Sequence, residues 1–488
     1  MTSDLDLTPV LVGVGIATRR DEDFRQALEP MDLMLEAVAA AGTDSGSAAT
    51  LTGAQYIAVP RGRWSYANPA GEINRALGTN AVTVLASVGV LQQTLIGEAC
   101  ARIARGEAHT TLVAGADCGY RLLRAQIAGE PAPERTHDDV PNITLHPKDE
   151  LRHAVEKRAG FRMPVGLYAI MESAFRARQG WSVSEHRDRL AQLGERFSRV
   201  AEQNPHAWSR RVVTAAAIRD PGERNPLQAF PYTRYHCSTW NVDQAAALVF
   251  CSAARASELV IDRSRWVYPL ASTESNHMVA VSARARLDEC IGARIAGLAA
   301  LEAAELRASD IDLVELYSCF PIAVQAYAIA LGLPLARDLT VTGGMPFAGG
   351  PYNNYVLQAT CRSAELLRAG RGRTALVSSV SGVLTKQGFG VWSNHPAPNE
   401  FIHQDLSDAV RAATPTRDVL ENYSGPARVA GFTVLHGRGQ PPRGAALVDT
   451  PEGHRAMATS EDAPLIERMQ AEEFVGRQVM IERNALLT

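Results

Sequence analysis

The chain has 488 residues, 46% of them hydrophobic and 21% charged, and its formal net charge is −4. A chain of this length exceeds what one hydrophobic core covers, so we expect two or three domains. The nearly balanced charge argues against nucleic acid or an anionic membrane as a partner.

The N-terminal segment is expected to form a first strand. Its apolar run, residues 9–16, comes before Arg19 and Arg20, which is the reverse of the order in a secretory signal. No apolar run reaches the roughly 18 residues that span a bilayer, and the seven cysteines form no CxxC pair or disulfide framework. We therefore expect a soluble, cytoplasmic and reduced protein without membrane insertion.

Strand-like apolar runs alternate with alanine- and leucine-rich segments of helical period up to about residue 400. This alternation predicts an α/β protein with a mostly parallel, helix-covered sheet. The stretches that begin at Gly106 and Gly370 share the frame G-x-x-x-T-x-L-V, and each follows a helical segment that ends in basic residues. Two unrelated strands can share such a frame by coincidence, but the common order of helix, glycine and strand favours a duplicated α/β unit.

A long insert, roughly residues 120–239, interrupts the first half and shows no strand alternation. Its middle predicts two helices, the first ending at Gly180 and the second capped by Ser182 or Ser184 and ending before Pro205. An insert of this kind usually covers a site.

After about residue 404 the pattern changes to short alternating runs with turn signals. This pattern predicts a small, mostly antiparallel and barrel-like β domain. The expected division is therefore residues 1–262 for the first α/β half, 263–404 for the second and 405–488 for the additional domain.

Three motifs carry a family resemblance: the alanine-rich strand at residues 241–248, the run ELYSCFP at 315–321 and the stretch VTGGMPFAGGPYNNY at 341–355. With the two α/β repeats and the insert, they resemble the thiolase superfamily over roughly residues 8–395. The closest likeness is to the thiolase-like proteins of the first type, often labelled acetyl-CoA acetyltransferases, which also carry the threonine–lysine element found here at 385–386. The resemblance implies a duplicated βαβαβαββ fold and an extra C-terminal domain.

The catalytic groups that the resemblance implies are mostly missing. Thiolases carry their nucleophilic cysteine where this chain has Leu85 to Val90, and none of these residues is cysteine. They carry their activating histidine where this chain has Gly350. Ser87 is the one conceivable substitute nucleophile, but a serine without a base is unreactive. Cys319 matches the acid/base cysteine of sterol-carrier-type thiolases, although a buried structural cysteine fits the position equally well.

The remaining candidates are expected to bind or polarise a thioester. Glycines 349 and 350 let the backbone approach a pocket, and Asn353 or Asn354 can cap the next helix, whose free amides would polarise a carbonyl. The predicted catalytic residues are Cys319, Tyr317 and Tyr352; the predicted substrate-binding residues are Gly349, Gly350, Asn353, Lys386, Ser87 and Gly89.

A metal site is not expected. One loop of the insert is rich in potential ligands, but they lack metal-ligand spacing and fit a solvated loop better; they are His137, Asp138, Asp139, His146, Asp149 and His153. No cofactor is required, and a coenzyme A thioester is the expected ligand.

Three functions remain open. The protein can bind an acyl-CoA or lipid thioester without forming an acyl-enzyme, or it can make or break a carbon–carbon bond beside a thioester by a retro-aldol or Claisen-type route. It can also be a non-catalytic interaction subunit. The expected assembly is a monomer or a homodimer.

Overall fold

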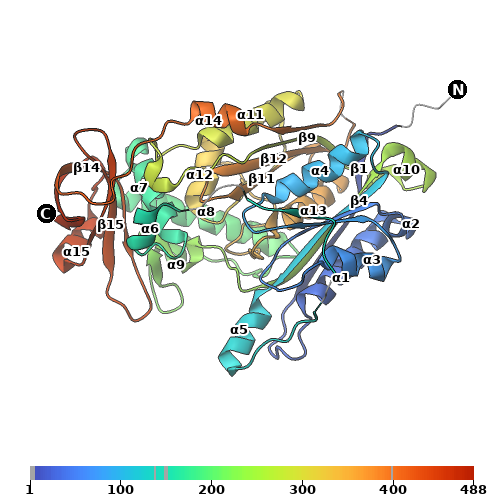
Figure 1. Cartoon of the computed structure of the whole chain (residues 1–488), viewed down its shortest axis with the longest axis horizontal. Helices are drawn as coiled ribbons and strands as arrows, with labels where there is room; N and C mark the ends of the chain where they lie inside the picture. Colours follow the sequence, from blue (N-terminus) through green and yellow to red (C-terminus); the bar gives the residue numbers. More distant parts are fainter. Residues whose placement is uncertain (1–5, 137–138, 148–151, 397–398, 488) are drawn as a thin grey trace.

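The computed structural model describes residues 6–136, 139–147, 152–396 and 399–487. Two α/β halves form the body of the molecule, and the C-terminal strands lie at one end of its long axis, next to the helices of the insert (Figure 1). None of the helices in these residues is long and apolar enough to cross a membrane.

The first half is a six-stranded sheet in the order β1-β8-β4-β2-β3-β5. Strands β2 to β5 run parallel to one another, and β8 runs antiparallel to both β1 and β4. The strands are β1 (Pro9–Arg19), β2 (Tyr56–Pro60), β3 (Val82–Ala86), β4 (Thr110–Cys118), β5 (Ile143–Leu145) and β8 (Asp243–Ser252). The helices are α1 (Pro30–Ser45), α2 (Ala49–Thr52), α3 (Pro69–Leu77), α4 (Gln92–Ala104), α5 (Gly119–Ala128) and α10 (Ala253–Glu258).

The second half repeats this arrangement in a sheet of order β10-β11-β12-β9-β13. Its strands are β9 (Tyr268–Ser275), β10 (Leu313–Glu315), β11 (Thr374–Ser381), β12 (Lys386–Ser393) and β13 (Ile402–Asp405), and its helices are α11 (Ile291–Ala303), α12 (Pro321–Ala330) and α13 (Tyr355–Arg368). Strands β4 and β11 both begin at the threonine of the repeated frame, and each pairs with one parallel and one antiparallel neighbour. The predicted duplication is confirmed.

The halves differ at one strand. Between α12 and α13 the structure assigns no strand, whereas β3 occupies that place in the first half. The backbone amides of Val341 and Thr342 donate instead to the buried carboxylate of Glu315, at 2.8 and 2.9 Å. Because this carboxylate accepts from the amides that a neighbouring strand would need, Val341 and Thr342 lie in a bend and do not pair as a strand.

The insert contains the two predicted helices. Helix α7 (Val165–Gln179) ends at Gly180 in the left-handed conformation, and the Ser182 hydroxyl caps α8 (Val183–Gln203). The insert also adds α6 (Ala154–Arg158), α9 (Ala215–Arg219), β6 (Leu227–Ala229) and β7 (Tyr232–Thr233), together with β5. These strands are too short to give the alternating pattern that was missing from the sequence of the insert.

The C-terminal region is the predicted small β domain. Strands β14 (Gly425–Leu435), β15 (Arg443–Asp449), β16 (Arg455–Ser460), β17 (Gln478–Glu482) and β18 (Ala485–Leu487) close into a five-stranded barrel, because β14 pairs with both β15 and β17. Helix α14 (Ser407–Ala413) precedes the barrel and α15 (Ala463–Ala471) packs on it.

The barrel is joined to the insert by a buried interface. Strand β14 pairs with β6, and the amide of Phe432 donates to the Ser173 hydroxyl on α7 at 2.8 Å. The guanidinium of Arg176, whose side chain is 1% exposed, donates two hydrogen bonds of 2.9 Å to the Glu473 carboxylate. A bidentate pair of this kind fixes both distance and orientation between the two regions.

Candidate functional site

The turn between β3 and α4 is the centre of the candidate site. Ser87 follows the last residue of β3, and Gly89 adopts a φ of +101°, which side chains other than glycine rarely tolerate. Pro147 lies against Gly89, so that an added Cβ would also meet the proline ring. Within the described residues no side chain caps α4, so the positive end of a 13-residue helix lies just beyond the turn.

Groups from the second half hold this turn in place. The ammonium of Lys386 donates to the carbonyl oxygen of Gly89 at 3.1 Å, and the Ser381 hydroxyl donates to the same oxygen at 3.4 Å. Lys386 is only 3% exposed and begins β12. The structure therefore brings together Ser87, Gly89 and Lys386, three of the predicted substrate-binding residues, although they come from different halves.

The fold also gives Ser87 a histidine. Ser87 Oγ lies 2.9 Å from Nδ1 of His146, and the Ser87 amide donates to the carbonyl of Leu145, also at 2.9 Å. Pairing of β5 with β3 places His146 directly beside the serine. The sequence showed no histidine partner for Ser87, because His146 belongs to the insert and no local motif links it to the serine.

A cavity of about 390 Å³ adjoins this pair. Its walls come from the turn before α4, from the end of β5, from the second half and from α14 of the C-terminal region. The lining residues are Val90, Thr94, Leu145, His146, Pro147, Asn276, Lys386, Asp405, Ser407, Asp408 and Arg411. The cavity therefore lies where both halves and the additional domain meet.

A buried acid, Glu274, lies behind the cavity wall. Its carboxylate accepts hydrogen bonds from Thr94 Oγ1 and from Asn276 Nδ2, and both of these residues line the cavity. Burial raises the pKa of Glu274 from its ordinary value of 4.5 to about 7. The sequence offered no motif for Glu274, since it is simply one residue near the end of an apolar strand.

The predicted acid/base residues lie in a tighter region. Cys319 follows β10, and the hydroxyl of Tyr168 from the insert hydrogen-bonds to its thiol. Burial raises the pKa of Cys319 to about 12 and that of Tyr317 above its usual range, so both groups are protonated at neutral pH. The pocket beside Ser318 and Phe320 has a free volume of only about 20 Å³.

The two glycines of the VTGGMPFAGGPYNNY stretch approach the protein's own side chains. Gly349 has a φ of +103°, and a Cβ there would overlap with Gln244. A Cβ at Gly350 would overlap with Ser238, and the Gly350 amide donates to the carbonyl of Thr239 at 2.9 Å. These glycines were predicted to bring the backbone close to a ligand, whereas the groups that they approach here are the end of the insert and strand β8.

The expected capping of α13 is wrong. The Asn354 side chain makes no capping bond within the described residues, and the Val356 amide donates to Oε1 of Gln92 at 2.7 Å. Asn353 accepts from Nε2 of the same glutamine at 3.4 Å. Gln92, the first residue of α4, therefore already accepts from the Val356 amide, one of the α13 amides that had been expected to polarise a carbonyl.

Tyr352 lies apart from the other two predicted catalytic residues. Its φ is +33°, it is 37% exposed, and the guanidinium of Arg63 lies 5.6 Å from its ring centre. Tyr317, in contrast, is buried and packs edge-on against Tyr355.

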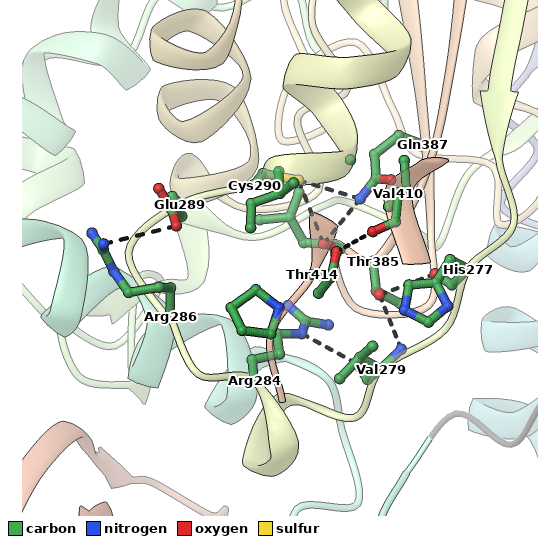
Figure 2. Close-up of a pocket in the computed structure, with 14 residues that line it drawn as sticks. His277, Val279, Arg284, Arg286, Glu289, Cys290, Thr385, Gln387, Val410 and Thr414 are labelled. Carbon is green, nitrogen blue, oxygen red and sulfur yellow. Dashed lines mark hydrogen bonds and ion pairs between the residues drawn. The ribbon is translucent and has the colours of Figure 1, made fainter. Parts of the chain in front are cut away.

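Gln387, the neighbour of Lys386, lies in a separate small cavity of about 40 Å³. Figure 2 shows its amide directed toward Cys290, to whose sulfur Nε2 donates at 3.2 Å. Because successive side chains of a strand point to opposite faces, Lys386 reaches the large cavity and Gln387 does not.

Among the residues that the structure describes, no three histidine, cysteine, aspartate or glutamate side chains are grouped as metal ligands would be. His137, Asp138 and Asp149 of the ligand-rich loop lie outside the described residues.

Known proteins share this fold and parts of this sequence. Residues 405–485 match the family described as thiolase-like protein type 1 additional C-terminal domain. An acetyl-CoA acetyltransferase of Methanocaldococcus jannaschii is 28% identical over 156 residues, which cover 32% of this chain and 37% of that protein. The match thus spans little more than a third of the length of this curated relative.

Two solved structures extend the comparison. The monomeric SCP2-thiolase like protein type 1 from Mycobacterium smegmatis superposes with a TM-score of 0.81 at 25% identity, over 98% of this chain and 97% of that chain. The Ltp2-ChsH2(DUF35) aldolase superposes with a TM-score of 0.62 at 16% identity, over 80% of this chain and 99% of that chain. The second likeness shows the fold alone. The chain therefore shares its fold with the type 1 thiolase-like protein over almost its whole length, and its residues 405–485 match the additional C-terminal domain of such proteins.

Proposed function

We propose that the protein binds an acyl-CoA or lipid thioester in the large cavity and does so without forming an acyl-enzyme on cysteine. The observation that carries this proposal is the cavity of about 390 Å³ between the halves, lined by His146 and Lys386 and adjoining the Ser87 turn. This volume falls within the range of about 300–1,000 Å³ that small-molecule sites occupy.

The lining suits the pantetheine arm of such a ligand. Thr94, Asn276 and Ser407 are uncharged and polar, and because their donors already bind Glu274 and Asp405, it is chiefly their oxygens that can accept from its amides. The charges of Lys386 and Arg411 are balanced by two aspartates, Asp405 and Asp408, so the walls carry little net charge at neutral pH. A neutral polar arm fits these walls better than a cluster of phosphates, which we place outside the cavity.

The state of the thiols argues against a cysteine acyl-enzyme. A thiolate is the nucleophilic form of cysteine, and at a pKa of about 12 the thiol of Cys319 stays protonated. Burial likewise raises the pKa of the neighbouring Cys237 to about 12.

Isothermal titration with coenzyme A, acetyl-CoA and hexanoyl-CoA tests the binding. Val90→Trp places a large ring in the cavity wall and should weaken affinity at least tenfold, whereas Ile127→Trp, on the exposed face of α5, is the matched control. If none of the three ligands gives a heat of binding at millimolar concentration, the proposal is contradicted and a non-catalytic interaction subunit becomes the favoured function.

A retro-aldol reaction on a thioester is the second candidate function. Glu274 supports it, because a carboxylate with a pKa of about 7 beside the cavity can serve as a base at neutral pH. The fold shared with the Ltp2-ChsH2(DUF35) aldolase gives it a precedent. Release of aldehyde from a 3-hydroxyacyl-CoA should fall at least about 100-fold in Glu274→Gln; a rate unchanged by this substitution would rule out the glutamate as the base.

The edge of the first sheet supports a monomeric assembly. Strand β5 pairs with β3 over three residue pairs, so the chain covers this edge with its own insert. Light scattering during gel filtration should give a mass near 52.6 kDa, and a mass of twice that value at micromolar concentration would contradict a monomer.

A further inference from the structure

We propose that Ser87 and His146 form a catalytic dyad that takes the acyl group from the thioester and passes it to water. The choice of substrate rests on the proposed function, but the dyad itself rests on the geometry of the pair. Ser87 Oγ lies 2.9 Å from Nδ1 of His146, within the distance that proton transfer requires.

The backbone around Ser87 is built like a nucleophile-bearing turn. Ser87 stands where a parallel strand ends, and the left-handed Gly89 turns the chain so that α4 begins at Gln92. The uncapped start of α4 provides amide donors and the positive end of the helix dipole for the negative oxygen that forms during attack. Lys386 and Ser381 fix the turn through the Gly89 carbonyl.

The pair is also accessible to a ligand. His146 is exposed and lines the cavity of about 390 Å³, and Ser87 is partly exposed. Cys319 is partly exposed as well, but its neighbours Ser318 and Phe320 line a pocket of only about 20 Å³, and its thiol keeps its proton at neutral pH. A thioester in the cavity of about 390 Å³ therefore meets His146 and the turn that carries Ser87, whereas the protonated thiol of Cys319 is a poor nucleophile.

The reaction balances with water as the acceptor. Ser87 Oγ bonds to the thioester carbonyl carbon while its proton passes to Nδ1 of His146. The carbon–sulfur bond then breaks, the leaving thiolate takes the proton from His146, and the acyl group remains as an ester on Ser87. Water attacks this ester, His146 accepts the proton from water and returns it to Ser87 Oγ, and a free carboxylic acid leaves.

Three measurements on the full chain test the dyad. Thiol release from acetyl-CoA and hexanoyl-CoA reports on thioester cleavage, and p-nitrophenyl acetate is an acyl donor that needs no coenzyme A site. Intact-mass and peptide mass spectrometry after rapid quenching locates the acyl group. Ser184→Ala and His454→Ala, in exposed positions on α8 and between β15 and β16, are the matched controls.

We expect the acyl group on Ser87, loss of release to the background rate in Ser87→Ala, and a decrease of about 10²- to 10⁴-fold in His146→Ala. The controls should retain the wild-type rate, and all four variants should keep the wild-type melting temperature because the replaced side chains are wholly or partly exposed. A label on another residue, or at least half of the wild-type rate in Ser87→Ala, overturns the dyad.

Titration with coenzyme A separates this inference from the proposed function. If acyl-CoA binds but neither donor is cleaved, the dyad is wrong and the binding function stands. If p-nitrophenyl acetate acylates Ser87 and no acyl-CoA binds, the dyad stands and the thioester assignment fails.

Discussion

Replacing Glu274 with glutamine should remove a pH-dependent part of the free energy of unfolding. Burial raises the pKa of this carboxyl to about 7 from an ordinary value of 4.5, so the folded chain holds the proton more tightly than the unfolded chain does. The stabilisation is complete below the unfolded pKa and is lost as pH rises through the folded pKa. Wild-type stability should therefore fall between about pH 4.5 and pH 8.

The size of the effect follows from these two pKa values. At about 1.4 kcal/mol for each pKa unit, their difference corresponds to about 3 kcal/mol, which is a large share of a typical stability of about 5–15 kcal/mol. Glutamine preserves the contacts, since its NH₂ group can donate to Thr94 Oγ1 and its oxygen can accept from Asn276 Nδ2. Stability of Glu274→Gln relative to wild type should therefore rise by about 3 kcal/mol from pH 4.5 to pH 8.

Urea unfolding followed by tryptophan fluorescence at pH 4.5, 6, 7 and 8 measures this difference. The comparison must be made between the two proteins, because burial also raises the pKa of Asp243 to about 7 and this carboxyl titrates in the same range. Glu302→Gln, at an exposed position on α11, should track the wild type at every pH. A Glu274→Gln curve that also runs parallel to the wild type, within about 0.5 kcal/mol, would refute the reasoning.

Three further outcomes are expected. Glu315→Ala should lower the free energy of unfolding by at least about 3 kcal/mol, because it leaves buried backbone and hydroxyl donors without an acceptor; Glu315→Gln, which keeps one acceptor oxygen, should cost about half as much, and equal urea midpoints would contradict this. Gly89→Ala should destabilise by about 1–3 kcal/mol through its positive φ and the contact with Pro147 and should weaken acyl-CoA affinity, so a wild-type titration would count against the turn as part of the site. Cys319→Ala should leave thiol release from hexanoyl-CoA within twofold of the wild type, and a tenfold loss would restore the thiol as a catalytic group.

Local sequence patterns predicted most of the fold. The repeated frame at Gly106 and Gly370 identified two equivalent strands because helix, glycine and strand recur there in one order, and β4 and β11 follow it. Gly180 ended α7 as expected from its freedom at positive φ. Strands such as β7, with two residues, could not be predicted, since so short a segment shows no period.

The sequence predicted the site only in part, because the residues that form it are far apart in the chain and come together only on folding. Gly89 and Lys386 were expected to bind a ligand, but their direct contact depends on how the two halves pack. His146 was assigned to a polar loop, and only the pairing of β5 with β3 places it beside Ser87. No sequence pattern singled out Glu274, because its raised pKa depends on burial in the folded protein, which the sequence of one strand does not predict.

The bidentate bond between Arg176 and Glu473 has a consequence for the design of shortened chains. Truncation at residue 404 would remove Glu473, the carboxylate partner of Arg176, and β14, the neighbour of β6. It would also remove α14, which forms part of the cavity wall. An uncompensated buried cation costs several kcal/mol. Deletion of the barrel should therefore yield insoluble or proteolysed material, and a shortened chain that is meant to fold has to retain it.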